Sequence, residues 1–137
     1  VPEVVECAKK KKKTVQGLYE NSLKIATLRN LFLRYICDLE GVELNGLQGL
    51  SAVMNLWVQG VSNVDLVYKA DLRGLCIAAG SACASASIKP SHVLLAMGLD
   101  ETRAKESVRI SFGKNNTEAE IKRAAVIFKE IVRELRG

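Results

Sequence analysis

One cysteine of this 137-residue chain lies in a segment whose composition suits a reactive thiol. Cys83 is part of residues 79–87, a run made only of Ala, Ser, Gly and Cys. Such small side chains bury little apolar area, so we expect this segment to be mobile or to lie close against a ligand. A thiol exposed on a mobile loop can act as a nucleophile, whereas a buried cysteine behaves as a small hydrophobic residue. Both interpretations of Cys83 are open at this point.

Arg109 is the second residue whose position suggests chemistry. It lies between Val108 and Ile110 in a segment with the pattern of a strand. A guanidinium in the middle of a strand needs an acceptor, and its planar set of donors fits a carboxylate. A bound ligand and a carboxylate side chain of the protein would both serve. The single histidine, His92, stands near a predicted helix start, where a purely structural role is the more common one.

The remaining cysteines do not form a metal-binding pattern. Cys7, Cys37 and Cys76 are widely separated from one another and from Cys83, and no two cysteines make a C-x-x-C pair. This argues against a zinc ribbon and against a disulfide framework, so we expect no metal site. We expect these three thiols to be inert residues within regular elements. Free thiols are typical of a reducing compartment, which indicates the cytoplasm or an organelle matrix.

The positive charge is concentrated in one run. The net charge is +5, and the five consecutive lysines at residues 9–13 account for all of it. Nucleic-acid binders often have aromatic residues interleaved with their basic ones, and no aromatic residue lies inside this run. We therefore expect a solvated stretch of helix and no bound nucleic acid. Binding to an anionic partner, or a targeting role, is the alternative. No apolar run is long enough to cross a membrane, and no signal-peptide pattern opens the chain. The absence of a starting Met indicates a segment of a longer protein.

The surrounding pattern predicts an α+β fold with a small mixed or antiparallel sheet covered by helices. Residues 3–39 lack proline and predict one long N-terminal helix, or two helices kinked near Gly17, with Gly41 as the stop signal. Strands are predicted at residues 42–45, 53–58, 75–78 and 108–112. Helices are predicted from Ser62 to Gly74, from Ser91 to Gly98, over residues 101–106, and from Thr117 to Leu135. The last helix opens with a T-x-x-E capping box.

Several motifs occur together in an order typical of one enzyme family. They are G-S-A-C at residues 80–83, P-S-H-V-L at 90–94 and V-R-I-S-F-G at 108–113, with D-L-R-G at 71–74 and N-T-E-A-E-I at 116–121. With these motifs the sequence resembles the C-terminal part of the cysteine desulfurases, which are pyridoxal-phosphate enzymes of the class V aminotransferase group. The similarity extends over essentially the whole chain and is densest from Asp71 to Ile121.

The resemblance implies a role for each matching residue. Cys83 corresponds to the catalytic cysteine, which takes the sulfur of L-cysteine as a persulfide while alanine is released. Arg109 corresponds to the arginine that binds the substrate carboxylate. The mobile loop that carries the thiol corresponds to Gly80, Ser81, Ala82, Ala84 and Ser85, together with Cys83. Ser91 and His92 belong to a motif that shapes the following helix.

The resemblance also implies an organisation and a set of partners. Residues 1–40 would be the long helix that leads from a larger domain, and residues 41–137 the small α+β domain of this family. The family binds pyridoxal phosphate through a lysine in a Ser-Gly-His-Lys-like segment, which this sequence lacks. The segment alone is therefore expected to be inactive. The implied partners are L-cysteine and a sulfur acceptor such as an iron–sulfur scaffold protein. The full-length enzyme is expected to be a homodimer without membrane association.

Two further functions are compatible with the same residues. One is a non-catalytic remnant that serves only as a binding or assembly module. The other is a selenocysteine lyase-like enzyme that uses the same site for a different substrate.

Two departures from the family pattern are the lysine run at residues 9–13, which replaces a mixed helix, and Ala79 and Ala86, which make the loop slightly stiffer.

Overall fold

The long N-terminal helix forms without a break. A computed structural model describes residues 2–46, 51–80 and 89–137, with side chains from residue 15 onward. Helix α1 covers Pro2–Ile36, so Gly17 introduces no kink. The helix ends three residues earlier than predicted, where the Leu39 N–H donates to the Ile36 carbonyl in a turn (3.0 Å). Gly41 follows in the left-handed region, with φ of 64°, as expected for a residue that redirects the chain after a helix.

A three-stranded antiparallel sheet lies at the centre of the fold. Its strands are β1 (Val42–Leu44), β2 (Val53–Val58) and β3 (Ser107–Ser111), in the order β1-β2-β3. Alternate residues of β2 and β3 point to opposite faces of the sheet. One face is apolar, and its buried side chains are Met54, Leu56, Val58, Val108 and Ile110. The opposite face, here called the polar face, carries Asn55 and Arg109.

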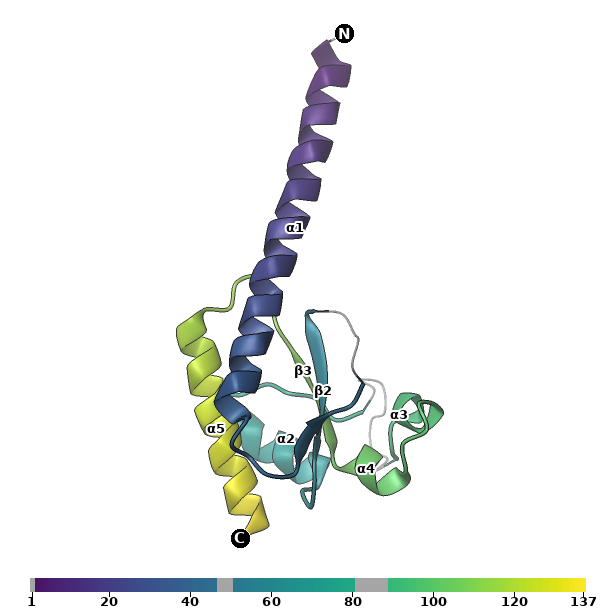
Figure 1. Cartoon of the computed structure of the whole chain (residues 1–137), viewed down its shortest axis with the longest axis vertical. Coiled ribbons are helices and arrows are strands. Elements are labelled where there is room, and N and C mark those ends of the chain that lie inside the picture. Colours follow the sequence, from purple (N-terminus) through teal and green to yellow (C-terminus); the bar gives the residue numbers. More distant parts are fainter. Residues whose placement is uncertain (1, 47–50, 81–88) are drawn as a thin grey trace.

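Three helices bury the apolar face. Helix α5 (Glu118–Arg136) runs beside the C-terminal half of α1, and α2 (Asn63–Leu72) contacts both α5 and β3 (Figure 1). Phe32 of α1 lies between Phe128 of α5 and Phe112, with edge-to-face contacts at centroid distances of 5.8 and 5.9 Å. These aromatic contacts join both helices to the end of β3.

Two short helices lie away from this helical layer. Helix α3 covers His92–Ala96, and α4 covers Glu101–Lys105 and leads directly into β3 (Figure 1). Asp100 caps α4 by accepting a hydrogen bond from the Arg103 N–H (2.8 Å). Since α4 and β3 are joined by a single residue, the position of Arg103 relative to the sheet is closely defined.

The predicted fold is confirmed in outline and wrong in one element. The α+β class, the antiparallel sheet and the long first helix are all present. The predicted strand at residues 75–78 does not form, because only Ala78 pairs with the sheet, in an isolated bridge to Arg109. The segment before it is tied to the end of α2 instead, where the Leu75 N–H donates to the Ala70 carbonyl (2.9 Å).

The predicted capping box at the start of α5 is confirmed. The Thr117 side chain accepts a hydrogen bond from the Glu120 N–H (3.2 Å), and the Glu120 carboxylate accepts one from the Thr117 N–H (2.9 Å). The bond from the Thr117 N–H is the main reason why the pKa of Glu120 lies below its usual value. A lowered pKa in the folded state means that this contribution to stability is present at neutral pH. The contribution is lost as the pH falls below the pKa of Glu120 in the unfolded chain and through its lower pKa in the folded chain.

We predict that Thr117→Ala lowers the free energy of unfolding by about 1 kcal/mol at pH 7, the usual cost of losing an N-cap. Glu120→Gln, the matched control, keeps an acceptor for the Thr117 N–H but cannot titrate. Urea denaturation at pH 7 and at pH 4 measures both effects. The stability of Glu120→Gln should depend less on pH than that of the unmodified chain. Equal stability of Thr117→Ala and the unmodified chain at pH 7 would contradict the assignment of the cap.

Candidate functional site

The polar face of the sheet presents Arg109. Its neighbours in β3, Val108 and Ile110, are buried in the apolar core, so strand alternation directs the Arg109 side chain to the opposite face. The arginine is half-buried there. The predicted placement of Arg109 in the middle of a strand is therefore confirmed, whereas its role as a carboxylate ligand stays a prediction.

The backbone of Arg109 holds the segment that leads to the Cys83 loop. The Arg109 N–H donates to the Ala78 carbonyl (2.7 Å), and the Ala78 N–H donates to the Arg109 carbonyl (3.0 Å). Gly80 follows with φ of 68°, a conformation that favours glycine. Cys83 lies five residues beyond Ala78, and five residues of extended chain span at most about 18 Å. The chain therefore enters the predicted loop directly beside the strand that carries Arg109.

Most of the predicted loop lies outside the described residues. The loop residues that are not described are Ser81, Ala82, Cys83, Ala84 and Ser85. Their predicted roles stay predictions, and Gly80 is the last described residue before them.

A hydrogen-bonded network next to Arg109 was not anticipated from the sequence. Arg103 Nε donates to Asn45 Oδ1 (2.8 Å). Asn45 Nδ2 donates to Asn55 Oδ1 (2.7 Å) and to Ser107 Oγ (2.8 Å). The Ser107 hydroxyl donates in turn to the Arg103 carbonyl (2.6 Å). The network joins β2, β3, α4 and the residue that follows β1, so the polar face is held by side chains as well as by the backbone.

Trp57 extends this network toward the edge of the sheet. Its Nε1 donates to Glu106 Oε2 (2.8 Å), and the Arg103 guanidinium lies over its ring, 4.3 Å from the centroid. Arg103 also pairs with Glu43 (3.4 Å). The face of β2 that carries Asn55 and Trp57 is thus polar. The period-two alternation of Asn55 with buried residues was the available signal.

The remaining predicted site residues lie apart from the network. His92 is exposed at the start of α3, and Ser91 occupies the N-cap position without a side-chain capping bond. Cys37 and Cys76 are exposed, so the expectation of inert thiols inside regular elements is wrong about their positions. Cys37 follows the end of α1, and Cys76 lies in the extended segment before Ala78. At both places the side chain is exposed to solvent.

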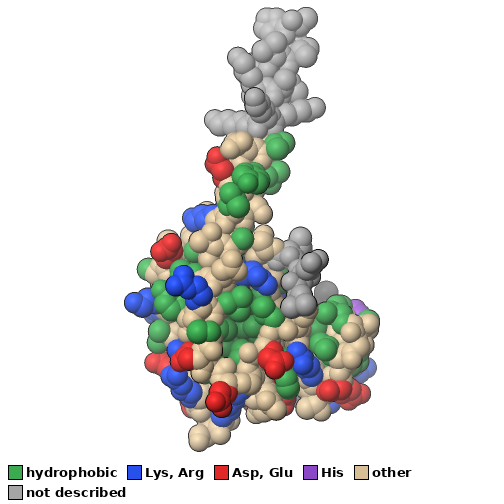
Figure 2. Space-filling model, in the orientation of Figure 1, with side chains coloured by type: hydrophobic (Ala, Val, Ile, Leu, Met, Phe, Trp, Pro, Cys, Tyr) green, Lys and Arg blue, Asp and Glu red, His purple; other side chains and the backbone are tan. Residues whose placement is uncertain are grey.

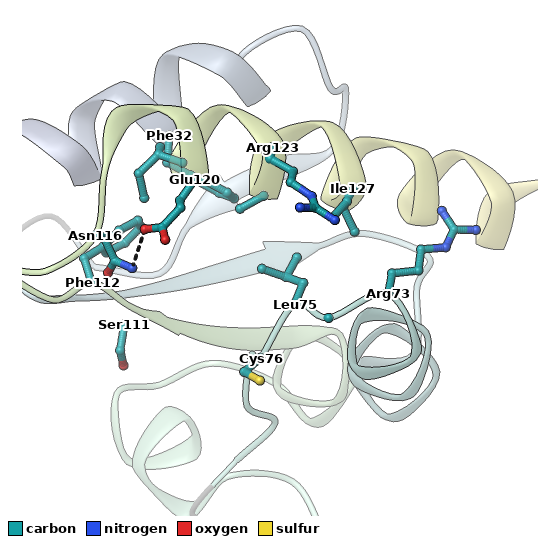
Figure 3. A pocket seen from close by; sticks show the side chains of 13 residues that line it. Phe32, Arg73, Leu75, Cys76, Ser111, Phe112, Asn116, Glu120, Arg123 and Ile127 are labelled. Carbon is teal, nitrogen blue, oxygen red and sulfur yellow. Dashed lines mark hydrogen bonds between the residues drawn. The ribbon is translucent and has the colours of Figure 1, made fainter.

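A pocket of about 430 Å³ lies between α1, α5 and residues 73–76. Figure 3 shows Arg73, Arg123 and Cys76 around it. Arg73 is engaged by Glu134 (2.5 Å) and Glu130 (3.4 Å), both on α5. The pocket thus lies beside a cluster of ion pairs between Arg73 and α5. The described residues that line the pocket do not include Arg109.

Comparison with known proteins identifies the family. A family model described as aminotransferase class-V matches residues 14–124. The chain belongs to the aminotransferase class-V family. The predicted resemblance is therefore confirmed at the level of the family.

Relatives of this class-V chain carry a more specific name. It is 39% identical over 128 residues to the cysteine desulfurase IscS of Vibrio cholerae, covering 92% of the chain and 30% of the relative. It is 36% identical over 140 residues to the putative cysteine desulfurase IscS 1 of Bacillus subtilis, covering 98% of the chain and 37% of the relative. The class-V chain therefore spans about a third of the length of these relatives.

A solved structure gives the same result for the fold. The NifS-like protein from Rickettsia africae superposes with a TM-score of 0.70 at 27% sequence identity, over 82% of the class-V chain and 29% of that protein. None of the helices among the described residues combines the length and the apolar character that a bilayer crossing requires.

We predict that Ala78→Pro destroys the anchor of the loop, because proline has no N–H to donate to the Arg109 carbonyl. Amide hydrogen exchange at Arg109 should become faster. Ala79→Pro is the matched control, since it leaves the Ala78 N–H in place and favours extended backbone at residue 78. Unchanged exchange at Arg109 in Ala78→Pro would show that the bridge does not hold this segment.

Proposed function

We propose that this chain is the part of a cysteine desulfurase that carries the sulfur-accepting thiol, Cys83, and the carboxylate-binding residue, Arg109. The pairing of Ala78 with Arg109 is the observation that carries the proposal. It brings the start of the predicted loop to the strand of the predicted clamp, although Cys83 and Arg109 are far apart in the sequence. The names of the relatives supply the reaction class.

Arg109 would bind the carboxylate of L-cysteine. Arg109 is half-buried on a face where Asn45, Asn55 and Ser107 are joined by hydrogen bonds. Partial burial strengthens a charge-assisted bond relative to one in bulk water, and a guanidinium offers two parallel donors to a carboxylate. Since the backbone of Arg109 is paired on one side with Ala78, the base of its side chain has a fixed position.

Cys83 would accept the sulfur atom. In the proposed reaction the substrate carbon–sulfur bond breaks, a sulfur–sulfur bond forms at Cys83, and the substrate carbon gains a proton. L-cysteine and the thiol thereby become alanine and a persulfide, with all atoms and electrons balanced. The persulfide would then be passed to an acceptor such as an iron–sulfur scaffold protein, and a loop anchored at one end by Ala78 suits a group that serves two sites.

The described residues of the polar face do not fit a pyridoxal phosphate site. The cofactor is held in its enzymes through a Schiff base to a lysine. The strand positions on the polar face hold no lysine. Described lysines occupy other places: Lys69 pairs with Glu134, and Lys129 pairs with Asp38 (2.7 Å). We therefore place the cofactor, and the electron withdrawal that it supplies, outside this chain.

The exposed face of α1 supports this division. The helix projects well beyond the sheet (Figure 1), and apolar side chains gather on its projecting part (Figure 2). Val15, Leu18 and Tyr19 are 65%, 65% and 63% exposed, and Leu23 is 53% exposed. Apolar residues at this spacing form one stripe, which is typical of a helix that packs on another surface. In our proposal residues 1–40 lead from a cofactor-binding domain, and residues 41–137 form the small domain.

We predict that iodoacetamide alkylates Cys83 faster than Cys37 and Cys76, roughly threefold to tenfold at pH 7, because a nearby guanidinium favours the thiolate. Cys37 and Cys76 are exposed internal references. Mass spectrometry after short labelling times gives all rates in one sample.

Arg109→Gln is the diagnostic variant. It should slow alkylation of Cys83 and leave the rates at Cys37 and Cys76 unchanged. Alkylation of Cys83 at or below the rates of the two references in the unmodified chain would contradict the proposed nucleophile.

A further inference from the structure

Asn55 and Arg109 occupy the closest kind of facing position in an antiparallel sheet. They are register partners in β2 and β3. The Asn55 carbonyl faces β1, where it accepts a hydrogen bond from the Asn45 N–H (2.9 Å), and both backbone polar groups of Arg109 face Ala78. The two residues therefore form a non-hydrogen-bonded pair, in which the Cα atoms lie about 4.5 Å apart and the side chains approach most closely.

The network on the polar face determines which atom of the Asn55 amide is bonded to Asn45. Arginine can only donate, so the bond from Arg103 Nε identifies the acceptor atom of Asn45 as Oδ1. Asn45 Nδ2 is then the donor to Asn55 (2.7 Å), which identifies the bonded atom of Asn55 as Oδ1. The Asn55 Nδ2 group consequently lies on the side of the amide away from Asn45. Arg109 is the register partner of Asn55 in β3, so its side chain is a direct neighbour of the Asn55 side chain on this face.

Two facing residues of the polar face therefore each carry a donor group. The Asn55 Nδ2 group and the Arg109 guanidinium cannot hydrogen-bond to each other, since neither offers an acceptor. A carboxylate has two oxygen atoms with several acceptor positions and can receive bonds from both.

We infer that Asn55 is a second binding residue for the carboxylate of a small amino acid held by Arg109, and that Asn45 is the positioning residue that orients its amide. The inference rests on the proposed function for the identity of the ligand. It adds to that proposal a specific donor, and it explains why the network is built around an asparagine and not around an apolar residue of the same size.

The orientation of the amide makes a distinctive variant available. Asn45→Asp keeps an acceptor for Arg103 Nε but has no donor for Asn55. The Asn55 amide then gains by turning its Nδ2 toward the carboxylate introduced at position 45 and its Oδ1 toward Arg109. A carbonyl oxygen in that place repels a bound carboxylate, so the variant should lose binding although Asn55 itself is unchanged.

L-alanine is the probe, because it carries the carboxylate and has no thiol that could react with Cys83. L-alaninamide, which lacks the carboxylate, is the matched control ligand. Titration of the full 137-residue chain, followed by ¹⁵N–¹H NMR of the Asn55 side-chain amide and of Arg109 Nε, reports both donors. The Asn55→Leu spectrum assigns the amide signals. We expect both groups to shift with L-alanine at one common dissociation constant and neither to shift with L-alaninamide.

The expected loss of affinity is roughly tenfold to hundredfold in Asn55→Leu, as for one hydrogen bond to a charged group. Asn45→Asp should weaken binding by at least as much. Shifts at Arg109 alone, with unchanged affinity in Asn55→Leu, would overturn the inference and leave the proposed role of Arg109 standing. The absence of shifts at both groups would overturn the inference together with the proposed carboxylate site.

Discussion

The two-sided pairing of Arg109 is the constraint on which the rest of the site depends. On one side its strand is paired with β2, and on the other its backbone exchanges two hydrogen bonds with Ala78. These contacts bring the entry to the Cys83 loop, the guanidinium and the Asn55 amide into one row across the sheet. The row joins segments that are distant in the sequence, so the site exists only when the sheet is formed.

The helices contribute by making this row rigid. Phe32, Phe112 and Phe128 pack beneath the sheet on its apolar face, and Val108 and Ile110 fix the strand on either side of Arg109. A close-packed core resists displacement of the backbone. The polar face can therefore present donors at defined positions, and the chemistry that we propose uses this face.

Local sequence patterns predicted the helices and most strands. They could not predict which distant segments pair with one another. The capping box at Thr117 depends on residues three apart and was predicted correctly. The four residues of the network, Asn45, Asn55, Arg103 and Ser107, come together only through strand register and the short connection from α4 to β3. The extended residues 75–78 look like a strand, but periodicity does not reveal how many of them find a partner. The roles of Cys83 and its loop came from the motif order and stay predictions.

The central claim is that the Cys83 thiol operates beside Arg109 and Asn55, and a distance measurement tests it most directly. A nitroxide label on Cys83, in a chain with Cys7, Cys37 and Cys76 changed to serine, broadens NMR signals of nearby protons. We expect strong broadening of the Arg109 amide and the Asn55 side-chain amide, with little effect at the far end of α5 around Arg136. Sharp signals at Arg109 and Asn55 together with broadening elsewhere on the domain would contradict the claim.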